Sequence, residues 1–381
     1  MTRIVVLGGG YAGMTAAITL AARTKRRDDV TITLVNATAR FTERLRLHQT
    51  AAGEQLADLR IPELLEGTRI EFVQGWVTGI DAHTVRVDDE HTIGYDKLVY
   101  ALGSVADTAT VPGADDHAYT LNTAQDAELL AGRLTNANTV AVCGSGLTGV
   151  EVAAEIAERH PDLHVVLLGR QEPGAQMGPK AKAYLQESLA RLGVEVRSGV
   201  EIVKIRPDAV ELTGETVEAD LVLWTSGVRV SPLAAKAGLE VDGHGRIVTD
   251  PQLRSISNPN VYAVGDSAAV QQAYGLMHGT CQSGMPTGVH AGTSIVRELN
   301  GKQPKRFRFG YLHIPVSLGR ADAVIQFVRP DETPKRLSLT GRRAVWYKET
   351  VSSAPWPSFQ RLKKMPAAGL FAWRRGGRYT R

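Results

Sequence analysis

The residues with the clearest chemical meaning are glycines, which occur in two groups with the same spacing. Gly8 to Gly13 reads GGGYAG and Gly144 to Gly149 reads GSGLTG, so both follow the pattern G-x-G-x-x-G. In such a group the first glycine permits a tight turn, the second lets the backbone approach a pyrophosphate, and the third lets a helix pack closely on a strand. Two groups predict two dinucleotide sites. The alternative is that one group is a structural copy without a ligand.

These glycines can bind phosphates only if each group joins a strand to a helix, because the free N–H groups and the positive dipole end of the helix then face the ligand. The sequence meets this requirement twice. Residues 4–7 and 140–142 are apolar runs typical of buried strands, and residues 14–23 and 148–160 favour helices. The same patterns predict a helix over residues 179–192, stopped by a glycine.

The strand after each glycine group ends without the acid that often binds a ribose hydroxyl in such sites. Asn36 stands at the end of the first of these strands, where an amide can still bond a hydroxyl without carrying charge. Gly169 stands at the end of the second, followed by Arg170, which could pair with the 2′-phosphate of NADPH or be an ordinary exposed arginine. The choice between NADH and NADPH stays open.

Three further segments read as strands that end at a glycine: residues 95–103, 224–228 and 260–266. Strand ends of this kind can bring backbone against a cofactor. Asp266 could accept hydrogen bonds from the hydroxyl groups of a sugar or ribityl chain, or it could cap a helix. Residues 41–53 contain Arg44, Arg46, His48 and Gln49, which either line a cofactor or form a solvated helix face with a half-exposed histidine. Residues 69–87 predict a small antiparallel β element.

The composition is that of a globular protein with two or three domains, given 381 residues. There is no run of about 18 apolar residues, and the first strand begins at the N-terminus, so we expect a cytoplasmic protein without a spanning helix or signal peptide. Cys143 and Cys281 are far apart in the sequence and form no C-x-x-C pair. We expect neither a redox-active disulfide nor a metal site.

The charge is divided unevenly along the chain. Residues 335–381 hold twelve Lys and Arg and one acid, whereas residues 1–334 hold 32 basic and 39 acidic residues. This basic C-terminal region also contains Trp346, Trp356 and Trp373. Cations interleaved with aromatics suit an anionic membrane surface, although Pro355, Pro357 and Pro366 break any long amphipathic helix. The alternative is that the tryptophans pack the region onto the body. No nucleic-acid-binding module is present.

With these residues in view, the chain resembles the two-dinucleotide-binding flavoproteins, and within them the type II NADH dehydrogenases. The resemblance rests on the two glycine groups and on the segments YDKLVYALG from Tyr95, WTSGV from Trp224 and VYAVGD from Val261. It implies an α/β fold with two Rossmann-like dinucleotide-binding domains, an FAD domain interrupted by an NAD(P) domain. We expect the FAD domain at residues 1–112 and 241–330, the NAD(P) domain at 113–240, and a small basic, tryptophan-containing region at 331–381.

The resemblance also implies which residues bind each cofactor. Those expected to contact FAD are Gly8, Gly10, Tyr11, Ala12, Gly13, Asn36, Gln49, Val77, Ala101, Gly103, Gly265, Asp266 and Gln282. Those expected to contact NADH or NADPH are Gly144, Gly146, Gly149, Glu151, Arg170 and Gly227. No catalytic residue is certain, because the flavin carries the reaction. Gln282 and Glu151 are the candidates.

The resemblance is incomplete at the acceptor side. The quinone motif of type II dehydrogenases reads approximately A-Q-x-A-x-Q, and the matching stretch here is CQSGMP, which keeps Gln282 but has Pro286 at the second glutamine. Sulfide:quinone oxidoreductases and disulfide reductases need a cysteine pair that this chain lacks. His278 and His290 flank the stretch and could serve a proton step, although each is more readily explained as structural.

Three hypotheses about function follow. The first is an FAD-dependent NAD(P)H dehydrogenase that passes electrons to a quinone or similar small molecule, with peripheral contact at the inner face of the cell membrane. The second is a soluble flavoprotein reductase that serves a protein partner or a biosynthetic intermediate. The third is a redox-responsive binding protein with slow turnover. The sequence leaves open whether the chain forms a homodimer.

Overall fold

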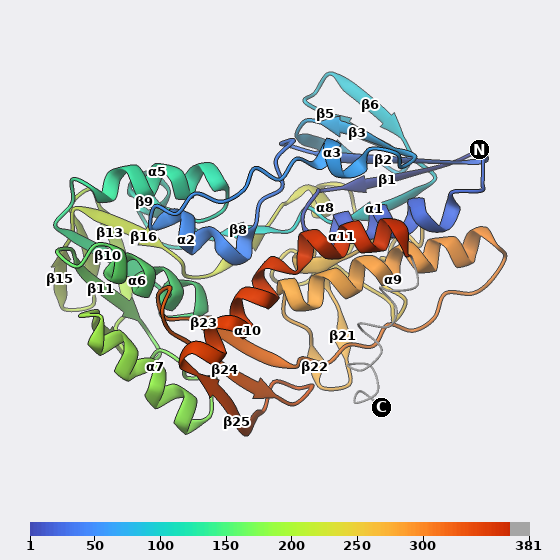
Figure 1. The fold of residues 1–381 in the computed structure, drawn as a ribbon. Helices are drawn as coiled ribbons and strands as arrows, with labels where there is room; N and C mark the ends of the chain where they lie inside the picture. The colour runs from blue at the N-terminus through green and yellow to red at the C-terminus, as the bar shows by residue number, and fades with distance from the viewer. Residues whose placement is uncertain (366–381) are drawn as a thin grey trace.

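A computed structural model describes residues 1–365, and they form two parallel-sheet units with a C-terminal region against both (Figure 1). The prediction of an α/β fold is confirmed. Trp373 and Pro366, which the sequence places in the basic C-terminal region, lie outside the described residues.

The first unit is built on a parallel sheet in the order β19-β7-β1-β2-β3. Its strands are β1 (Thr2–Leu7), β2 (Val30–Asn36), β3 (Ile70–Gln74), β7 (Lys97–Tyr100) and β19 (Val261–Ala263). β1 is central and its residues from Ile4 to Leu7 are buried, as expected for a strand covered on both faces. The strand order reverses at β1, because β2 and β3 lie on one side of it and β7 and β19 on the other. Ligands of such sheets bind at the carboxyl ends of the strands at this point.

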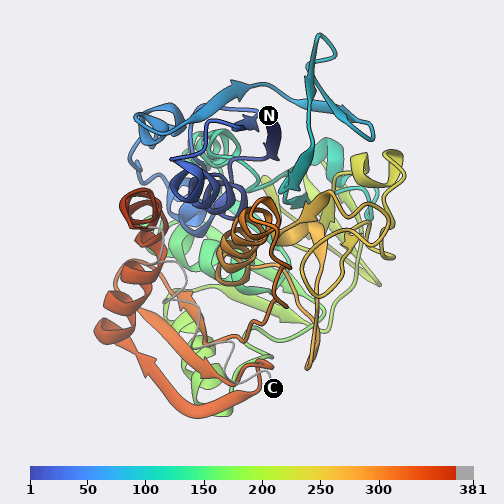
Figure 2. The ribbon, with the colours of Figure 1, turned by 90° about the vertical axis from the view of Figure 1, so that its right-hand side faces the viewer.

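Two helices from distant parts of the chain cross closely on this sheet. They are α1 (Tyr11–Thr24) and α9 (Cys281–Leu299), which lie side by side in Figure 2. Small residues permit the approach: a Cβ at Gly288 would lie 2.0 Å from the carbonyl oxygen of Ala12. The crossing therefore joins the first glycine loop to the segment that holds Gln282.

The second unit repeats this architecture in the order β12-β11-β10-β16-β9. Its parallel strands are β9 (Ala118–Tyr119), β10 (Thr139–Cys143), β11 (His164–Gly169), β12 (Glu195–Ser198) and β16 (Leu221–Trp224). Its helices are α4 (Ala114–His117), α5 (Ala124–Leu134), α6 (Leu147–Arg159) and α7 (Pro179–Arg191). The helices predicted over residues 148–160 and 179–192 are thus confirmed, each ending within one residue of the prediction.

Each unit also carries a three-stranded antiparallel meander. In the first unit it consists of β4 (Val77–Ile80), β5 (Thr84–Val87) and β6 (His91–Gly94), and in the second of β13 (Ile202–Arg206), β14 (Ala209–Leu212) and β15 (Glu215–Glu218). The antiparallel element predicted over residues 69–87 is confirmed in part, because residues 70–74 belong instead to the parallel sheet.

The chain passes between the units along two adjacent segments. β8 (Ser104–Ala106) leads out of the first unit, β17 (Val228–Val230) leads back, and the two pair antiparallel. The remaining short elements are η1 (Arg44–Arg46), α2 (Leu47–Ala51), α3 (Ile61–Leu65), α8 (Leu233–Lys236), β18 (Ile247–Val248), η2 (Gly265–Ser267), β20 (Ala268–Ala269), β21 (Gln271–Gln272) and β22 (Gly275–Leu276).

The C-terminal region is a three-stranded antiparallel sheet followed by two helices. Its elements are β23 (His313–Ser317), β24 (Ala323–Val328), β25 (Pro334–Thr340), α10 (Gly341–Ser353) and α11 (Pro355–Lys364). The domain boundary expected at residues 330/331 falls between β24 and β25, which are hydrogen-bonded neighbours. We therefore propose that this region begins at β23. Pro355 separates the two helices, and α11 packs on α1.

Candidate functional site

The first glycine loop has three glycines with three different surroundings. Gly8 has φ +96°, and a Cβ there would lie 2.3 Å from the carbonyl oxygen of Ala101. A Cβ at Gly13 would lie 1.8 Å from the carbonyl oxygen of Gly8. At Gly10 a Cβ would meet no atom within 4 Å. Gly8 and Gly13 therefore close the turn, whereas Gly10 faces open space at the start of α1.

The second glycine loop has the same geometry. Gly144 has φ +127°, and a Cβ there would lie 2.7 Å from Oγ1 of Thr225. A Cβ at Gly149 would lie 1.8 Å from the carbonyl oxygen of Gly144, and one at Gly146 would meet nothing within 4 Å. In both loops the middle glycine leaves a cradle beside a helix N-terminus that a side chain would fill. The residues present therefore fit a pyrophosphate at each loop.

Other expected cofactor residues gather at the first loop because β1, β7 and β19 end side by side. Ala101 and Gly103 follow β7, and Gly265 and Asp266 follow β19. A Cβ at Gly265 would lie 3.1 Å from Cβ of Ala12. Asp266 does not cap a helix; its Oδ2 accepts a hydrogen bond of 2.7 Å from the Ser104 hydroxyl.

Tyr11 lies inside the protein. Its ring packs edge-on against Phe41 at 5.2 Å, and Phe41 contacts Trp356 and Phe359 of α11. The Leu45 N–H donates to the Tyr11 hydroxyl at 3.3 Å. Burial raises the pKa of Tyr11 well above its usual value. Tyr11 therefore links the first loop to the C-terminal region.

Of the remaining expected residues of the first unit, Asn36 lies at the glycine loop and Val77 lies in the meander. Asn36 uses both ends of its amide within the protein: Oδ1 accepts from the Gly9 N–H at 2.7 Å, and Nδ2 donates to the Thr38 carbonyl at 2.8 Å. Asn36 thus holds the glycine loop. Val77 opens β4, where it is half-buried and pairs with Val87.

In the second unit, Gly227 follows β16 with φ +72°, and its carbonyl accepts from the Asp107 N–H. Arg170 follows β11 and its side chain is exposed. Glu151 lies one turn into α6, close to the second glycine loop.

Glu151 belongs to a buried cluster of charged and polar side chains where the two units and the C-terminal region meet. Lys348 Nζ lies 2.6 Å from Glu151 Oε1, which also accepts from the Ser317 N–H at 3.0 Å. His48 bridges two carboxylates: Nδ1 lies 3.8 Å from Glu151, and Nε2 lies 3.7 Å from Glu155. We call this set the junction cluster; it consists of His48, Glu151, Glu155, Ser317 and Lys348, together with Arg320, whose side chain is 39% exposed at its rim.

Burial sets the protonation of this cluster. Burial opposes ionisation of Glu151, but the Lys348 ammonium and the Ser317 N–H stabilise its carboxylate, and the pKa of Glu151 stays below its usual value. Burial raises the pKa of Glu155 to about 7, against the opposing charge of Arg320. Burial lowers the pKa of His48 to about 4, so this histidine is neutral at pH 7 and forms no ion pair there. The cluster thus holds one buried ion pair beside a carboxyl group that titrates near neutral pH.

The two glutamines expected near the flavin both hold protein segments together. Gln282 donates from Nε2 to the His313 carbonyl at 3.1 Å and accepts at Oε1 from the Leu312 N–H at 2.8 Å. Gln49 accepts from Arg46 at 3.0 Å and donates to Glu349 of α10 at 3.3 Å.

Sequence reasoning missed much of the junction cluster. Lys348 was expected only as one of many C-terminal cations, and His48 either as a residue lining a cofactor or as half exposed, yet each is 3% exposed. The i, i+4 spacing of Glu151 and Glu155 on α6 could have indicated a shared face. Nothing in the sequence indicates that Lys348 meets them.

Of the two histidines beside the Gln282 stretch, His278 is half-exposed and paired with Glu332 at 2.8 Å. His290 is largely buried against Phe307, and burial lowers its pKa to about 4. Cys143 and Cys281 are both free thiols. Burial raises the pKa of each, that of Cys281 to about 12, so neither is a thiolate at neutral pH.

Two phosphate-binding loops in two parallel-sheet units define a class, the flavoprotein oxidoreductases with two dinucleotide sites. Comparison with known proteins gives the family. The model of the pyridine nucleotide-disulphide oxidoreductase family matches residues 2–291, and the chain belongs to this family. FAD and NAD(P)H are therefore its cofactors, and it is an oxidoreductase.

Individual relatives agree with this assignment. The chain is 32% identical over 354 residues to an NADH dehydrogenase-like protein of Mycobacterium tuberculosis, covering 85% of this chain and 87% of the relative. It is 28% identical over 392 residues to the type II NADH:quinone oxidoreductase of Staphylococcus aureus, covering 92% and 94%. Among solved structures, the sulfide:quinone oxidoreductase of Aquifex aeolicus has a TM-score of 0.79 at 20% identity, covering 95% and 92%.

Proposed function

We propose that this oxidoreductase passes electrons from NAD(P)H to a quinone or a quinone-like acceptor. The flavin, when bound, accepts hydride from NAD(P)H and gives electrons to the acceptor. The protein contributes the two loops that orient the nucleotides and the surroundings in which the acceptor is protonated. Relatives whose names include quinone or NADH dehydrogenase support this proposal.

The observation that carries the proposal is the junction cluster. A quinone takes up protons as well as electrons when it is reduced, whereas a one-electron protein partner takes up none. Glu151, on the helix that starts at the second glycine loop, forms a buried pair with Lys348 of α10, and Glu155 beside them titrates near neutral pH. Such groups can hold and move a proton.

The cluster also reaches toward the first unit. Burial and the Asp266 carboxylate raise the pKa of Cys281, and the charges of Arg44 and Lys348 oppose them. Lys348 therefore acts on Cys281 at the start of α9 as well as on Glu151 on α6. Gln282, next to Cys281, is engaged with residues 312 and 313, so we expect it to shape the acceptor site by holding that segment.

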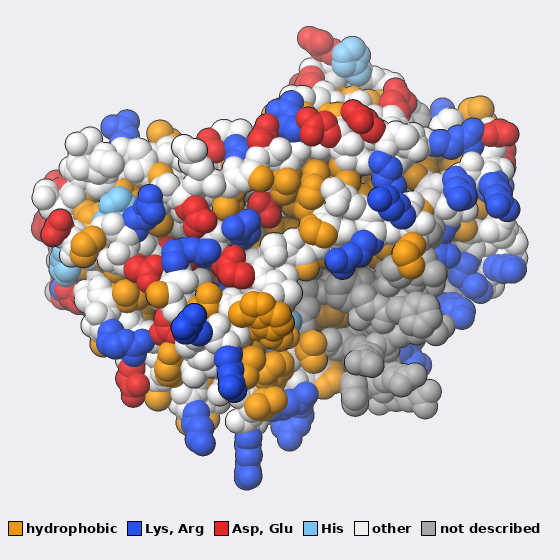
Figure 3. Space-filling view, in the orientation of Figure 1, with side chains coloured by type: hydrophobic (Ala, Val, Ile, Leu, Met, Phe, Trp, Pro, Cys, Tyr) orange, Lys and Arg blue, Asp and Glu red, His pale blue; other side chains and the backbone are white. Residues whose placement is uncertain are grey.

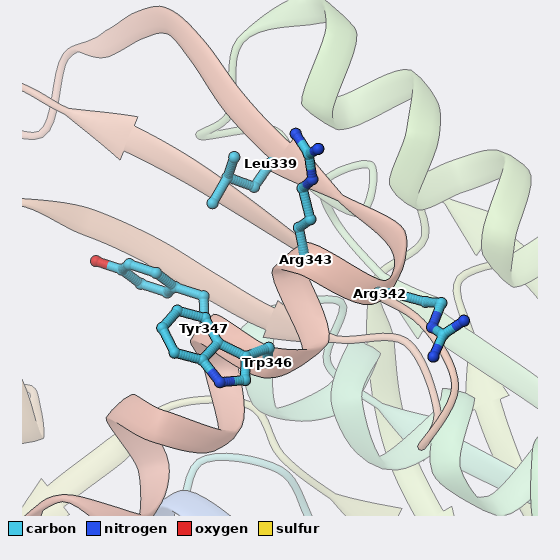
Figure 4. Close-up of a pocket in the computed structure, with 5 residues that line it drawn as sticks. All are labelled: Leu339, Arg342, Arg343, Trp346 and Tyr347. Carbon is cyan, nitrogen blue, oxygen red and sulfur yellow. The ribbon is translucent and has the colours of Figure 1, made fainter.

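We also propose peripheral membrane contact through a surface patch at α10 and β25. Figure 4 shows Leu339, Arg342, Arg343, Trp346 and Tyr347 around a cavity of about 390 Å³. We call these five residues the α10–β25 patch. Trp346 is 71% exposed, and hydrophobic and basic side chains lie together over this part of the surface (Figure 3). Aromatic and cationic side chains suit the interface of an anionic membrane.

By contrast, Trp356 is packed against Phe41, so the two tryptophans have different roles. Within residues 1–365 no helix is long and apolar enough to cross a membrane. Some of the cations counted in the basic C-terminal region, among them Arg374 and Arg375, lie outside the described residues.

The test of the proposed function is reoxidation of the reduced enzyme by a short-chain quinone under anaerobic conditions. The proposal requires the quinone to restore the oxidised flavin spectrum and to be converted to quinol. Reduction of the flavin by NAD(P)H without transfer to the quinone would refute it.

A further inference from the structure

The same backbone hydrogen bond occurs at both glycine loops, so positions in one unit can be matched to positions in the other. The match shows which residue stands where an acid often binds the nucleotide ribose. The Gly8 N–H donates to the Val35 carbonyl at 2.8 Å, and the Gly144 N–H donates to the Leu168 carbonyl at 2.8 Å. The residue after each carbonyl is therefore equivalent. Asn36 in the first unit corresponds to Gly169 in the second, and both end the strand next to the glycine loop.

Gly169 leaves no room for an acidic side chain. A Cβ there would lie 2.1 Å from Oγ and 3.0 Å from the backbone nitrogen of Ser145, which belongs to the glycine loop. The Ser145 hydroxyl donates to the Gln171 carbonyl at 2.6 Å, so this contact also fixes the path of residues 169–171. The carboxylate that commonly binds the ribose hydroxyls of NADH, and that repels a 2′-phosphate, is excluded from this position.

The charged residues that follow β11 favour the binding of an anion. Arg170 follows directly, its side chain is exposed, and within residues 1–365 its guanidinium makes no hydrogen bond or ion pair. The first acid after it, Glu172, is paired with Lys182 of α7. A guanidinium that is not engaged by the protein can bind a phosphate through two parallel hydrogen bonds.

We propose that NADPH is the reductant of this protein and that Arg170 binds its 2′-phosphate. The proposal deepens the proposed function, since it names the hydride donor. It depends on the NAD(P)H site alone and not on the identity of the acceptor.

The test is a binding measurement on the FAD-loaded protein with no acceptor present. Adenosine 2′,5′-bisphosphate and 5′-AMP differ only in the 2′-phosphate, and calorimetry gives their Kd values. We expect the bisphosphate to bind at least 10-fold more tightly to the native protein. Arg170→Ala should reduce this ratio of affinities to about 2-fold or less, mainly by weakening the binding of the bisphosphate.

Arg133→Ala is the matched control. Arg133 is also exposed and also belongs to the second unit. It lies near the end of α5, which leads into the start of β10, so it is at the amino ends of the strands, whereas Arg170 follows the carboxyl end of β11. It should leave the ratio unchanged. Equal binding of the two ligands by the native protein, or an unchanged ratio in Arg170→Ala, would overturn the proposal. A native protein that prefers the bisphosphate and is reduced by NADPH, but does not pass electrons to a quinone, would support the NADPH proposal and refute only the proposed acceptor.

Discussion

At the scale of the residue, the glycines of each loop divide into two kinds. Gly8, Gly13, Gly144 and Gly149 are required by the fold, because backbone atoms occupy the space of a side chain. Gly10 and Gly146 are not, since each has an ordinary negative φ and open space around it. The G-x-G-x-x-G spacing predicts this division, because the middle glycine is the one expected to face the pyrophosphate. The structure separates the residues that shape the loop from those that leave room for a ligand.

Alanine substitution at the middle glycines should therefore remove binding without harming the fold. Gly146→Ala should weaken NADP⁺ binding by more than about 10-fold and leave FAD content unchanged, while Gly10→Ala should lower FAD content. Neither should lose stability in urea unfolding of the apoprotein, because alanine at a compatible φ is neutral or stabilising by up to about 1 kcal/mol. Gly149→Ala, whose Cβ would overlap the Gly144 carbonyl, should impair folding. A destabilised Gly146→Ala variant with intact binding would contradict this assignment.

At the scale of the element, the junction cluster joins segments that the sequence gives no reason to connect. It brings together α2, α6, the end of β23 with the turn that follows it, and α10. Strands and helices were predictable because each rests on local periodicity. Lys348 is separated from Glu151 by almost 200 residues, and its burial depends on how α10 docks. The boundary expected at 330/331 separates β24 from β25, which are hydrogen-bonded neighbours, and this pairing is invisible in the local sequence.

The titration of Glu155 predicts a pH-dependent effect of its removal. Its pKa is raised from 4.5 to about 7, so the folded state binds more protons than the unfolded state between these values, and Glu155 lowers stability as pH rises through this window. Glu155→Gln should match the native protein near pH 4.5 and be more stable by roughly 2–3 kcal/mol at pH 8. Urea unfolding of the holoenzyme at both pH values measures this difference.

The control for Glu155 is Glu187→Gln, which makes the same change at an exposed position of α7. Its effect on the free energy of unfolding should be the same at both pH values. A Glu155→Gln effect that is equally independent of pH would show that this carboxyl group does not titrate near neutrality.

At the scale of the whole molecule, a mildly acidic body carries a basic C-terminal region on one side. The second unit is inserted into the first through β8 and β17, and the C-terminal sheet and helices contact both. The order of motifs along the sequence predicted this insertion, because the last strand of the first unit follows the whole of the second. The face on which the basic region exposes Trp346 could not be predicted, since that depends on how α10 packs.

Membrane contact belongs to this scale and can be tested by flotation with phosphatidylserine-containing vesicles. The full-length protein should bind at low salt and be released at about 0.5 M salt, where the Debye length is short. Trp346→Ala should reduce the bound fraction several-fold. Trp76→Ala is the control, because Trp76 is similarly exposed, 69% against 71%, but lies on the first unit. Equal effects of the two substitutions, or no binding by the native protein, would contradict the proposed contact.

The central claim is that this protein carries electrons from a nicotinamide nucleotide to a quinone. The most direct measurement is anaerobic stopped-flow absorbance of the holoenzyme, mixed first with NADPH or NADH and then with a short-chain quinone. We predict that NADPH bleaches the flavin band, with NADH slower at equal subsaturating concentration, and that the quinone restores the band within the same mixing sequence. A flavin that neither nucleotide bleaches, or a bleached flavin that the quinone leaves reduced, would contradict the account.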